Sequence, residues 1–156
     1  MKEAKKAKGS KEAKEMKRLA EMAVADAKDF GLYLDFTSKS LKDVERMAQA
    51  IHMAHRLEPL PEEVLLGIAN LYGAYLGEVL LRSGLNLLDY RWEEGGEGEI
   101  GICNETISMF PVTKVYKRLT QGPDHSLTEF FECMFGLAIG ATGPDDPRMH
   151  ILSAEE

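Results

Sequence analysis

The longest apolar run in the sequence extends from Val64 to Leu81 and is interrupted by three glycines. These are Gly67, Gly73 and Gly77, within the 18 residues VLLGIANLYGAYLGEVLL. Apolar residues all round a helix are typical of a helix buried in a core. A glycine inside a helix costs about 1 kcal/mol relative to alanine, so three of them indicate that another element lies close to the backbone. The pattern therefore predicts a central helix with a tightly packed glycine side.

The same run is at the lower limit of the length that crosses a bilayer. Its Gly73-xxx-Gly77 spacing also occurs where membrane helices pair. Asn70 and Glu78 argue against a membrane helix, because a carboxylate in lipid costs a few kcal/mol. We therefore expect a core helix and no membrane partner.

The N-terminal region combines a lysine-rich start with a helical pattern. Residues 1–9 are expected to be loose, and a helix is predicted from about Lys11 to Phe30 because Gly31 follows. Its apolar residues recur at helical spacing and should be buried: Leu19, Met22, Ala23, Ala27 and Phe30. Residues 32–36 alternate in polarity, which indicates an extended segment.

A second helix is predicted after Ser40, which resembles a capping box together with Asp43. Its apolar residues have the spacing of one helix face: Leu41, Val44, Met47, Ala48 and Ile51. This helix should stop before Pro59. Pro61 should stand in the first turn of the central helix, where its missing N–H does no harm.

Strand patterns follow the central helix. Tyr90 and Trp92, then the glycine-rich letters EEGGEG, then Ile100 and Ile102 are typical of a β-hairpin. A third strand is predicted over residues 106–110. Alternation places the side chains of Tyr90 and Trp92 on one face of the sheet.

Two shorter helices complete the pattern. One is predicted over residues 112–121 and the other over residues 127–139, with Ser126 and Glu129 as a second capping box. The last helix should bury Leu127, Phe130, Phe131, Met134 and Leu137. The composition of residues 141–156 is typical of turns and a tail.

The predicted fold class is α+β: a helix-rich single domain whose small antiparallel sheet of about three strands packs on the central glycine-containing helix. We expect a basic N-terminal segment at 1–18, one globular domain at 19–140 and a C-terminal tail at 141–156. A length of 156 residues with 44% hydrophobic and 29% charged residues fits one globular domain.

Charge is distributed unevenly along the chain. Residues 1–18 contain eight Lys or Arg and three Glu, a net charge of +5, and the other residues contain eleven bases and twenty-three acids, a net charge of −12. The basic segment has no aromatic residues or arginine cluster, so nucleic-acid binding is expected to be weak. The acidic body would suit a basic surface on a partner protein.

The two cysteines and the N-terminus favour a cytoplasmic location. Cys103 and Cys133 lack the CxxC spacing and are expected to be reduced, buried small hydrophobic residues. The N-terminal residues contain no apolar signal region. No cofactor is expected, because no P-loop, GxSxG, HExxH or Rossmann pattern is present.

Three segments carry a resemblance to known sequences: GAYLGEVLLRSG, the single Trp92, and FPVTKVYKRLTQGPDHSLTEFF. The chain over roughly residues 30–135 resembles a family of small uncharacterised bacterial proteins. That family has a G-x-Y-x-G-E helix, a tryptophan strand and an F-P…K-R-x-x-x-G segment. The resemblance implies an α+β fold and does not indicate any activity.

Glu78 is the first candidate for a site residue, because a carboxylate on an apolar helix must be paired, hydrogen-bonded or functional. Arg82 lies one turn on and is its nearest expected partner, with Arg91 as a second. A cleft between the central helix and the sheet could bring Tyr75, Glu78, Arg82 and Trp92 together as a ligand site.

Two further groups of residues are candidates. Lys114, Lys117 and Arg118 are predicted on the polar side of one short helix, where they could bind a phosphate or an acidic partner. His52 and His55 have a spacing that can place both rings on one helix face, but two ligands are too few for a metal site. They are expected to be partly exposed, and no metal is expected.

These observations favour a small protein-binding or regulatory module over an enzyme. An immunity-like protein that neutralises another bacterial protein is one form of this hypothesis. The first alternative is a ligand-binding domain or enzyme with a cleft around Glu78, Arg82 and Trp92. The second alternative is weak nucleic-acid binding through the N-terminal segment.

Overall fold

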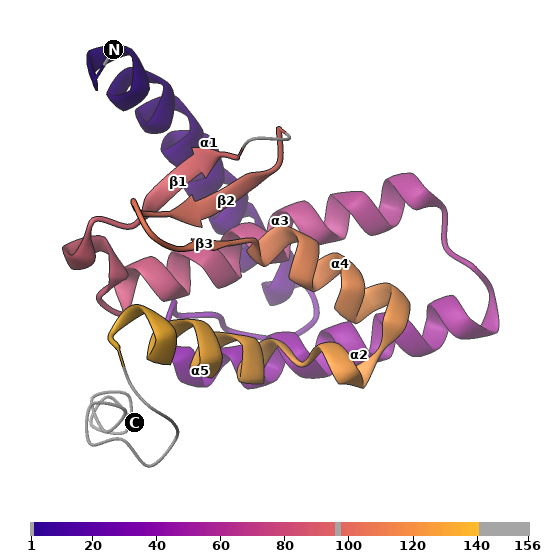
Figure 1. Cartoon of the computed structure of the whole chain (residues 1–156). Helices are drawn as coiled ribbons and strands as arrows, with labels where there is room; N and C mark the ends of the chain where they lie inside the picture. Colours follow the sequence, from indigo (N-terminus) through magenta and orange to yellow (C-terminus); the bar gives the residue numbers. More distant parts are fainter. Residues whose placement is uncertain (1, 96–97, 141–156) are drawn as a thin grey trace.

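The computed structural model describes residues 2–95 and 98–140. In this part of the chain a three-stranded antiparallel sheet lies at one side of a group of five α-helices, which confirms the predicted helix-rich α+β domain (Figure 1). The helices are α1 (Lys2–Lys28), α2 (Leu41–Leu57), α3 (Glu62–Arg82), α4 (Pro111–Gln121) and α5 (Leu127–Ala138). The strands are β1 (Arg91–Glu94), β2 (Ile100–Cys103) and β3 (Ser108–Met109). The predicted tail at 141–156 lies outside the described residues.

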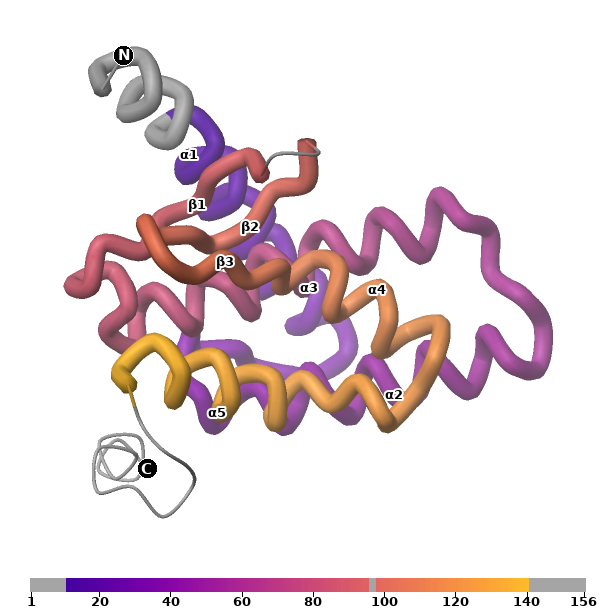
Figure 2. The backbone as a smooth tube through the Cα atoms, in the orientation of Figure 1, coloured from indigo at the N-terminus to yellow at the C-terminus, as the bar shows by residue number. Residues whose placement is uncertain are grey.

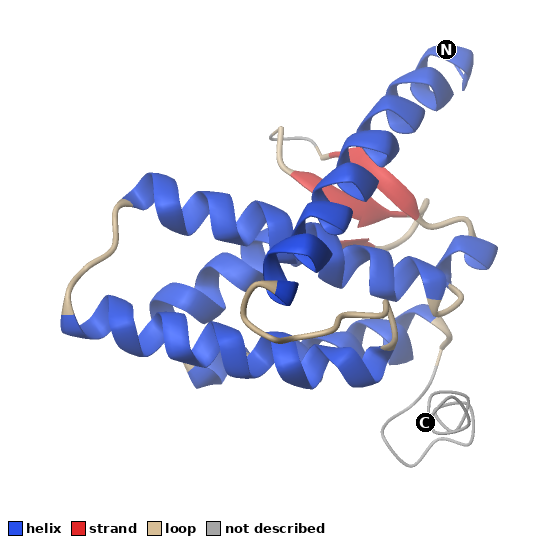
Figure 3. Ribbon diagram, turned by 180° about the vertical axis from the view of Figure 1, so that it is seen from behind, coloured by secondary structure: helices blue, strands red, loops and turns tan. Residues whose placement is uncertain are grey.

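Helix α3 forms the centre of the molecule. It lies between α1 and α4, and the view from behind shows α1 crossing it on the face opposite α4 (Figures 1 and 3). Every residue from Tyr72 to Leu81 is buried. Among the described residues, α3 alone is long and apolar enough to span a membrane, but 61% of its most apolar window is buried inside the fold. Its apolar surface is therefore used for packing.

The sheet packs one face against α3. Trp92 on β1 pairs with Ile102 on β2, which in turn pairs with Met109 on β3. All three side chains are buried, and so is Tyr90, as the alternation predicts. Arg91 lies on the exposed side.

Helix α1 differs from the prediction in its start and in its buried face. It begins at Lys2, whereas residues 1–9 were expected to be loose. Alanine, lysine and glutamate favour a helix over this stretch. The helix also crosses the boundary expected at residue 18, because Met16 already lies in the core.

The core face of α1 consists of Met16, Ala20, Ala23 and Ala27. Met22 and Phe30, which were predicted to be buried, are 45% and 69% exposed. Small alanine side chains allow α1 to lie close to α3, and larger side chains at these positions would hold the helices apart. Leu137 of α5 and Cys133 are likewise exposed rather than buried.

The first predicted capping box is wrong. Ser40 precedes α2, but its hydroxyl makes no cap bond. It donates to the carbonyl of Thr37 at 2.6 Å and lies 2.5 Å from the hydroxyl of Tyr75 on α3. The second box begins as predicted, because Ser126 Oγ accepts a bond from the backbone N–H of Glu129. Ser40 is thus used to attach the 32–40 segment to the central helix.

Two of the three glycines of α3 are contact points. A Cβ atom at Gly73 would lie 2.4 Å from the Cα of Val112, and one at Gly77 would lie 2.2 Å from the indole of Trp92. At Gly67 no atom lies within 4 Å of that position. The prediction of close approach is therefore confirmed for Gly73 and Gly77 and wrong for Gly67.

Gly67 and Gly77 should respond differently to alanine. Gly67→Ala is expected to raise the free energy of unfolding by about 0.5–1 kcal/mol, because it removes a helix-breaking residue at an open position. Gly77→Ala should lower it by about 1–3 kcal/mol through overpacking against the indole. Urea unfolding of both purified variants measures the difference. A similar change in both would show that close approach does not explain Gly77.

Candidate functional site

The carboxylate of Glu78 is buried and hydrogen-bonded on both oxygens. The indole N–H of Trp92 donates to Oε2 at 2.9 Å, and Arg82 Nη2 donates to Oε1 at 3.3 Å. The guanidinium of Arg82 lies over the ring of Phe36, 3.7 Å from its centroid. The second expected partner, Arg91, pairs instead with Glu93. Glu78 thus has the local partner predicted for it and a second one, Trp92, from the sheet.

Tyr75 belongs to the same buried region. Its hydroxyl accepts a bond from the backbone N–H of Phe36 at 2.8 Å and also contacts Ser40. Burial raises the pKa of the Tyr75 phenol, and the hydrogen bonds with Ser40 and Phe36 oppose this effect. The neutral phenol therefore fixes the segment before α2 to the central helix through two hydrogen bonds.

The structure brings Tyr75, Glu78, Arg82 and Trp92 close together, as the sequence predicts, but it fills the expected cleft. The ring of Trp92 is 1% exposed and packs directly on Gly77. Glu78 is also 1% exposed. These side chains hold the sheet, the central helix and residues 36–40 together, and both oxygens of Glu78, the indole N–H of Trp92 and the hydroxyl of Tyr75 have hydrogen-bond partners within the protein.

An open groove lies elsewhere, between β3, α4 and α5, and we call it the α4–α5 groove. Its volume is about 420 Å³. It is lined by Glu99, Ser108, Met109, Phe110, Thr113, Lys114, Lys117, His125, Phe130 and Met134. Three half-buried apolar side chains contribute to its surface: Phe110, Phe130 and Met134. The groove therefore combines basic groups with a partly exposed apolar surface.

The basic side of the groove is formed by Lys114 and His125. Lys114 Nζ lies 3.4 Å from Nδ1 of His125, and His125 Nε2 lies 2.8 Å from Oε1 of Gln121. Because an amide oxygen accepts only, Nε2 carries the proton and Nδ1 is the acceptor that faces the ammonium. Partial burial, and then the positive charges of Lys114 and Lys117, lower the pKa of His125, and Asp124 opposes them. Burial and the two nearby lysines thus both favour the neutral form of this imidazole.

Neither lysine of the groove has an acidic partner within 4 Å among the described residues. Lys114 lies 5.8 Å from the centroid of the Phe130 ring, and Lys117 is exposed. The one carboxylate that lines the groove, Glu99, accepts a hydrogen bond from the hydroxyl of Thr113. Two cationic groups are therefore available to an anionic ligand.

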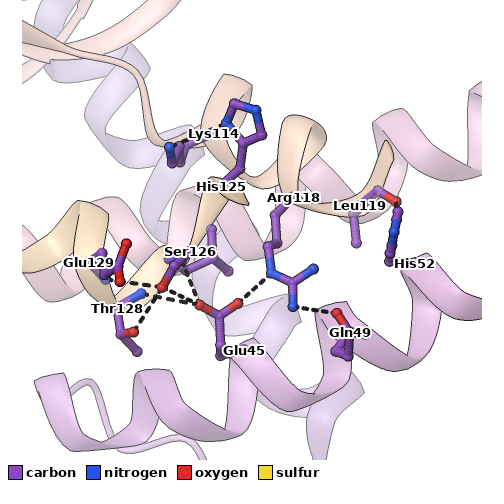
Figure 4. Close-up of polar contacts among 11 residues, drawn as sticks. Glu45, Gln49, His52, Lys114, Arg118, Leu119, His125, Ser126, Thr128 and Glu129 are labelled. Carbon is purple, nitrogen blue, oxygen red and sulfur yellow. Dashed lines mark hydrogen bonds and ion pairs between the residues drawn. The ribbon is translucent and has the colours of Figure 1, made fainter. Parts of the chain in front are cut away.

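Arg118 is separated from the two lysines with which it was grouped. Its side chain is buried and points toward α2, where Nε donates to Glu45 at 2.7 Å and Nη2 donates to Gln49 at 2.7 Å (Figure 4). Residue 118 lies three positions after Val115, on the buried face of α4. That spacing was the signal for burial, and the charge of the side chain obscured it.

Glu45 is the polar residue that sequence reasoning missed. Its Oε2 accepts the bond from Arg118, and its Oε1 accepts bonds from the hydroxyl of Ser126 and the backbone N–H of Leu127 at 2.8 and 2.7 Å. The carboxylate therefore lies at the N-terminus of α5 and joins α2, α4 and α5 (Figure 4). His125, which lines the groove, directly precedes Ser126, so Glu45 holds its neighbour in the chain.

The two histidines of α2 have separate structural partners. His52 is buried, not partly exposed, and its Nδ1 donates to the carbonyl of Leu119 at 2.8 Å. His55 Nδ1 accepts from the backbone N–H of Leu60 at 2.9 Å. Over residues 2–95 and 98–140, no three His, Cys, Asp or Glu side chains are grouped so as to hold a metal ion.

Together the fold and the groove define a helix-rich α+β domain with one basic, partly apolar candidate site. Comparisons with family models, with curated proteins and with solved structures found no match. The family resemblance of the sequence stays a prediction, and the assignment of function depends on the geometry of the groove.

Proposed function

We propose that this chain is a cytoplasmic protein-binding module that regulates its partner, and that the partner binds at the α4–α5 groove. The observation that carries this proposal is the pairing of Lys114 and Lys117 with a partly exposed apolar surface in one open groove. Protein interfaces commonly combine apolar contact with a few charged groups that determine specificity. A neutralising, immunity-like role is one form of such regulation.

Binding fits the groove better than catalysis does. A nucleophile needs a base within hydrogen-bond reach. The ring nitrogens of His125 contact Lys114 and Gln121, and neither partner is a hydroxyl or a thiol. The alternative site at Glu78, Arg82 and Trp92 is already occupied by its own internal hydrogen bonds.

The acidic body adds a long-range electrostatic attraction to the contacts made in the groove. Its net charge of −12 over residues 19–156 attracts a partner with a basic surface at long range. The groove has the opposite charge and accepts an acidic group at short range. A partner that presents an acidic contact segment within a mainly basic surface satisfies both.

Partner capture from the cells that produce this protein tests the proposal. The tagged full chain is compared with Lys114→Glu/Lys117→Glu, which places like charges against an acidic contact. We expect the amount of a specific partner captured by the variant to be lower than that captured by the wild-type chain by a factor of about ten or more, as measured by quantitative mass spectrometry. Thermal unfolding shows whether the variant is still folded.

The matched control is Lys14→Glu/Lys17→Glu. These two lysines have the same i, i+3 spacing and are exposed on α1, on the far side of α3 from α4. The control should retain the partner. Equal loss in both variants, or turnover of a small substrate by a pure chain that captures no partner, would contradict the proposal.

A further inference from the structure

We infer that the α4–α5 groove recognises a short extended segment of the partner in which a carboxylate lies next to an aromatic or branched aliphatic side chain. This inference rests on the proposed function and specifies the chemistry of the partner. It follows from the positions of the cationic groups, the apolar side chains and the one acidic residue around the groove.

The cationic end of the groove has only weak internal partners. The ammonium of Lys114 faces the neutral Nδ1 of His125 at 3.4 Å, a long contact for a charged donor. Lys117, one turn along α4, has no carboxylate oxygen within 4 Å in the described part of the chain. A carboxylate placed between the two lysines would form shorter, charge-assisted hydrogen bonds than the protein supplies.

The apolar part of the groove lies beside this cationic end. The ammonium of Lys114 lies 5.8 Å from the centroid of the Phe130 ring, and Phe110 and Met134 line the same groove. Methionine adapts its shape to different apolar ligands, and the phenylalanines offer ring faces. A volume of about 420 Å³ lies near the lower end of the usual range for small-ligand sites, about 300–1,000 Å³. The groove is thus large enough for a few side chains.

Glu99 gives the bound segment a direction. Its carboxylate is held by the hydroxyl of Thr113, on α4 one residue before Lys114. A second acidic group beside Glu99 would be repelled. The acidic residue of the segment should therefore lie toward His125, and its apolar residue should cover Phe130.

A peptide is favoured over a nucleic acid as the occupant. Arg118, whose guanidinium is suited to bidentate phosphate binding, points inward to Glu45. The lysines that remain form one short pair and not a continuous basic track, and the acidic body repels a phosphate backbone.

Three synthetic peptides test the inference. Each is an acetylated and amidated octapeptide flanked by Gly and Ser, with the centre Phe-Glu-Glu-Leu, Phe-Gln-Gln-Leu or Ser-Glu-Glu-Ser. The binding of each to the isotope-labelled full chain is followed by NMR titration. We expect the first peptide to bind at least about tenfold more tightly than either of the others, with shifts centred on Lys114, His125 and Phe130.

Protein variants locate the site. Lys114→Gln/Lys117→Gln should weaken binding of the first peptide at least about tenfold, while Lys114→Arg/Lys117→Arg and Lys14→Gln/Lys17→Gln should retain it. Bound carboxylate should also raise the pKa of His125 above its value in the free protein, because a nearby negative charge favours the imidazolium. The same titration monitors the charged groups around this ring, which are Lys114, Lys117, Asp124 and Glu99.

The outcomes separate this inference from the proposed function. Equal binding of the glutamine peptide, failure of the first peptide to bind, or tighter binding of a single-stranded RNA octamer would overturn the inference. If partner capture still depends on Lys114 and Lys117 in those cases, the proposed function stands. If the first peptide binds as expected but capture does not depend on the lysines, the inference stands and the function fails.

Discussion

Trp92→Ala is expected to lower the free energy of unfolding by about 3–5 kcal/mol. The indole is 1% exposed and fills the space between β1 and the glycine side of α3. Its removal leaves a cavity that a helix and a paired strand cannot easily close. A single domain is usually stable by about 5–15 kcal/mol, so this one change removes a large share of the total.

The polar edge of the indole adds to the effect. Its N–H donates to Oε2 of Glu78, whose side chain is itself 2% exposed. Without that donor, Oε2 of the buried carboxylate loses its hydrogen-bond partner. Trp92→Phe separates the two contributions, because it keeps most of the apolar ring and loses the N–H. We expect a smaller loss of about 1–3 kcal/mol for this variant.

Urea unfolding of the wild type and both variants measures these differences. The wild-type tryptophan should also show blue-shifted emission that is protected from quenchers. A red-shifted, readily quenched emission, together with a change of less than about 1 kcal/mol in Trp92→Ala, would show that the indole is an exposed ligand platform.

Much of the fold could be predicted because hydrophobic spacing is a local signal. The apolar run with its glycines predicts α3 and its tightly packed side, and period-two alternation predicts the hairpin. Turn residues mark the limits of these elements: α2 ends at Leu57, before Pro59, and α4 begins at Pro111. Such signals need no knowledge of distant residues.

The face of α1 could not be predicted in the same way. Large side chains such as Met22 and Phe30 have the greatest apolar area, so they were expected to point inward. The structure buries Ala23 and Ala27 as expected and adds Ala20, but it leaves Met22 and Phe30 exposed, because small side chains suit the close approach of α1 to α3. The distance between the two helices depends on the path of the whole chain, which Figure 2 traces.

The candidate site was predictable only in part. The sequence identifies Lys114 and Lys117 as a basic pair, and it groups Arg118 with them because the three are neighbours on one helix. The partner of Arg118 is Glu45, 73 residues earlier, and no local pattern records that pair. The groove is likewise formed by residues from Glu99 to Met134 whose proximity comes from the tertiary fold.

Glu45→Ala should destabilise the protein as strongly as Trp92→Ala, by about 3–5 kcal/mol. The side chain of Arg118 is 4% exposed, and Nη1 of its guanidinium is buried without a hydrogen-bond partner among the described residues. Removing the carboxylate would leave this charge buried and unpaired. The same change also removes the acceptor for the N–H of Leu127 at the start of α5.

Arg118→Met should cost less, because the side chain of Glu45 is 21% exposed and keeps its bonds from Ser126 and Leu127. The double variant Glu45→Ala/Arg118→Met should be more stable than Glu45→Ala alone, since it removes the unpaired charge together with its partner. Glu15→Ala on α1 breaks an exposed pair with Arg18 and should produce no resolved change.

Urea unfolding of these four variants gives the coupling between the two residues, and the NMR shift of His125 reports on the groove. We expect Glu45→Ala to alter that shift, because His125 directly precedes the serine that Glu45 holds. A loss of less than about 1 kcal/mol in Glu45→Ala would contradict the assignment of a buried pair. A large loss with an unchanged His125 shift would show that the junction supports the core but does not position the groove.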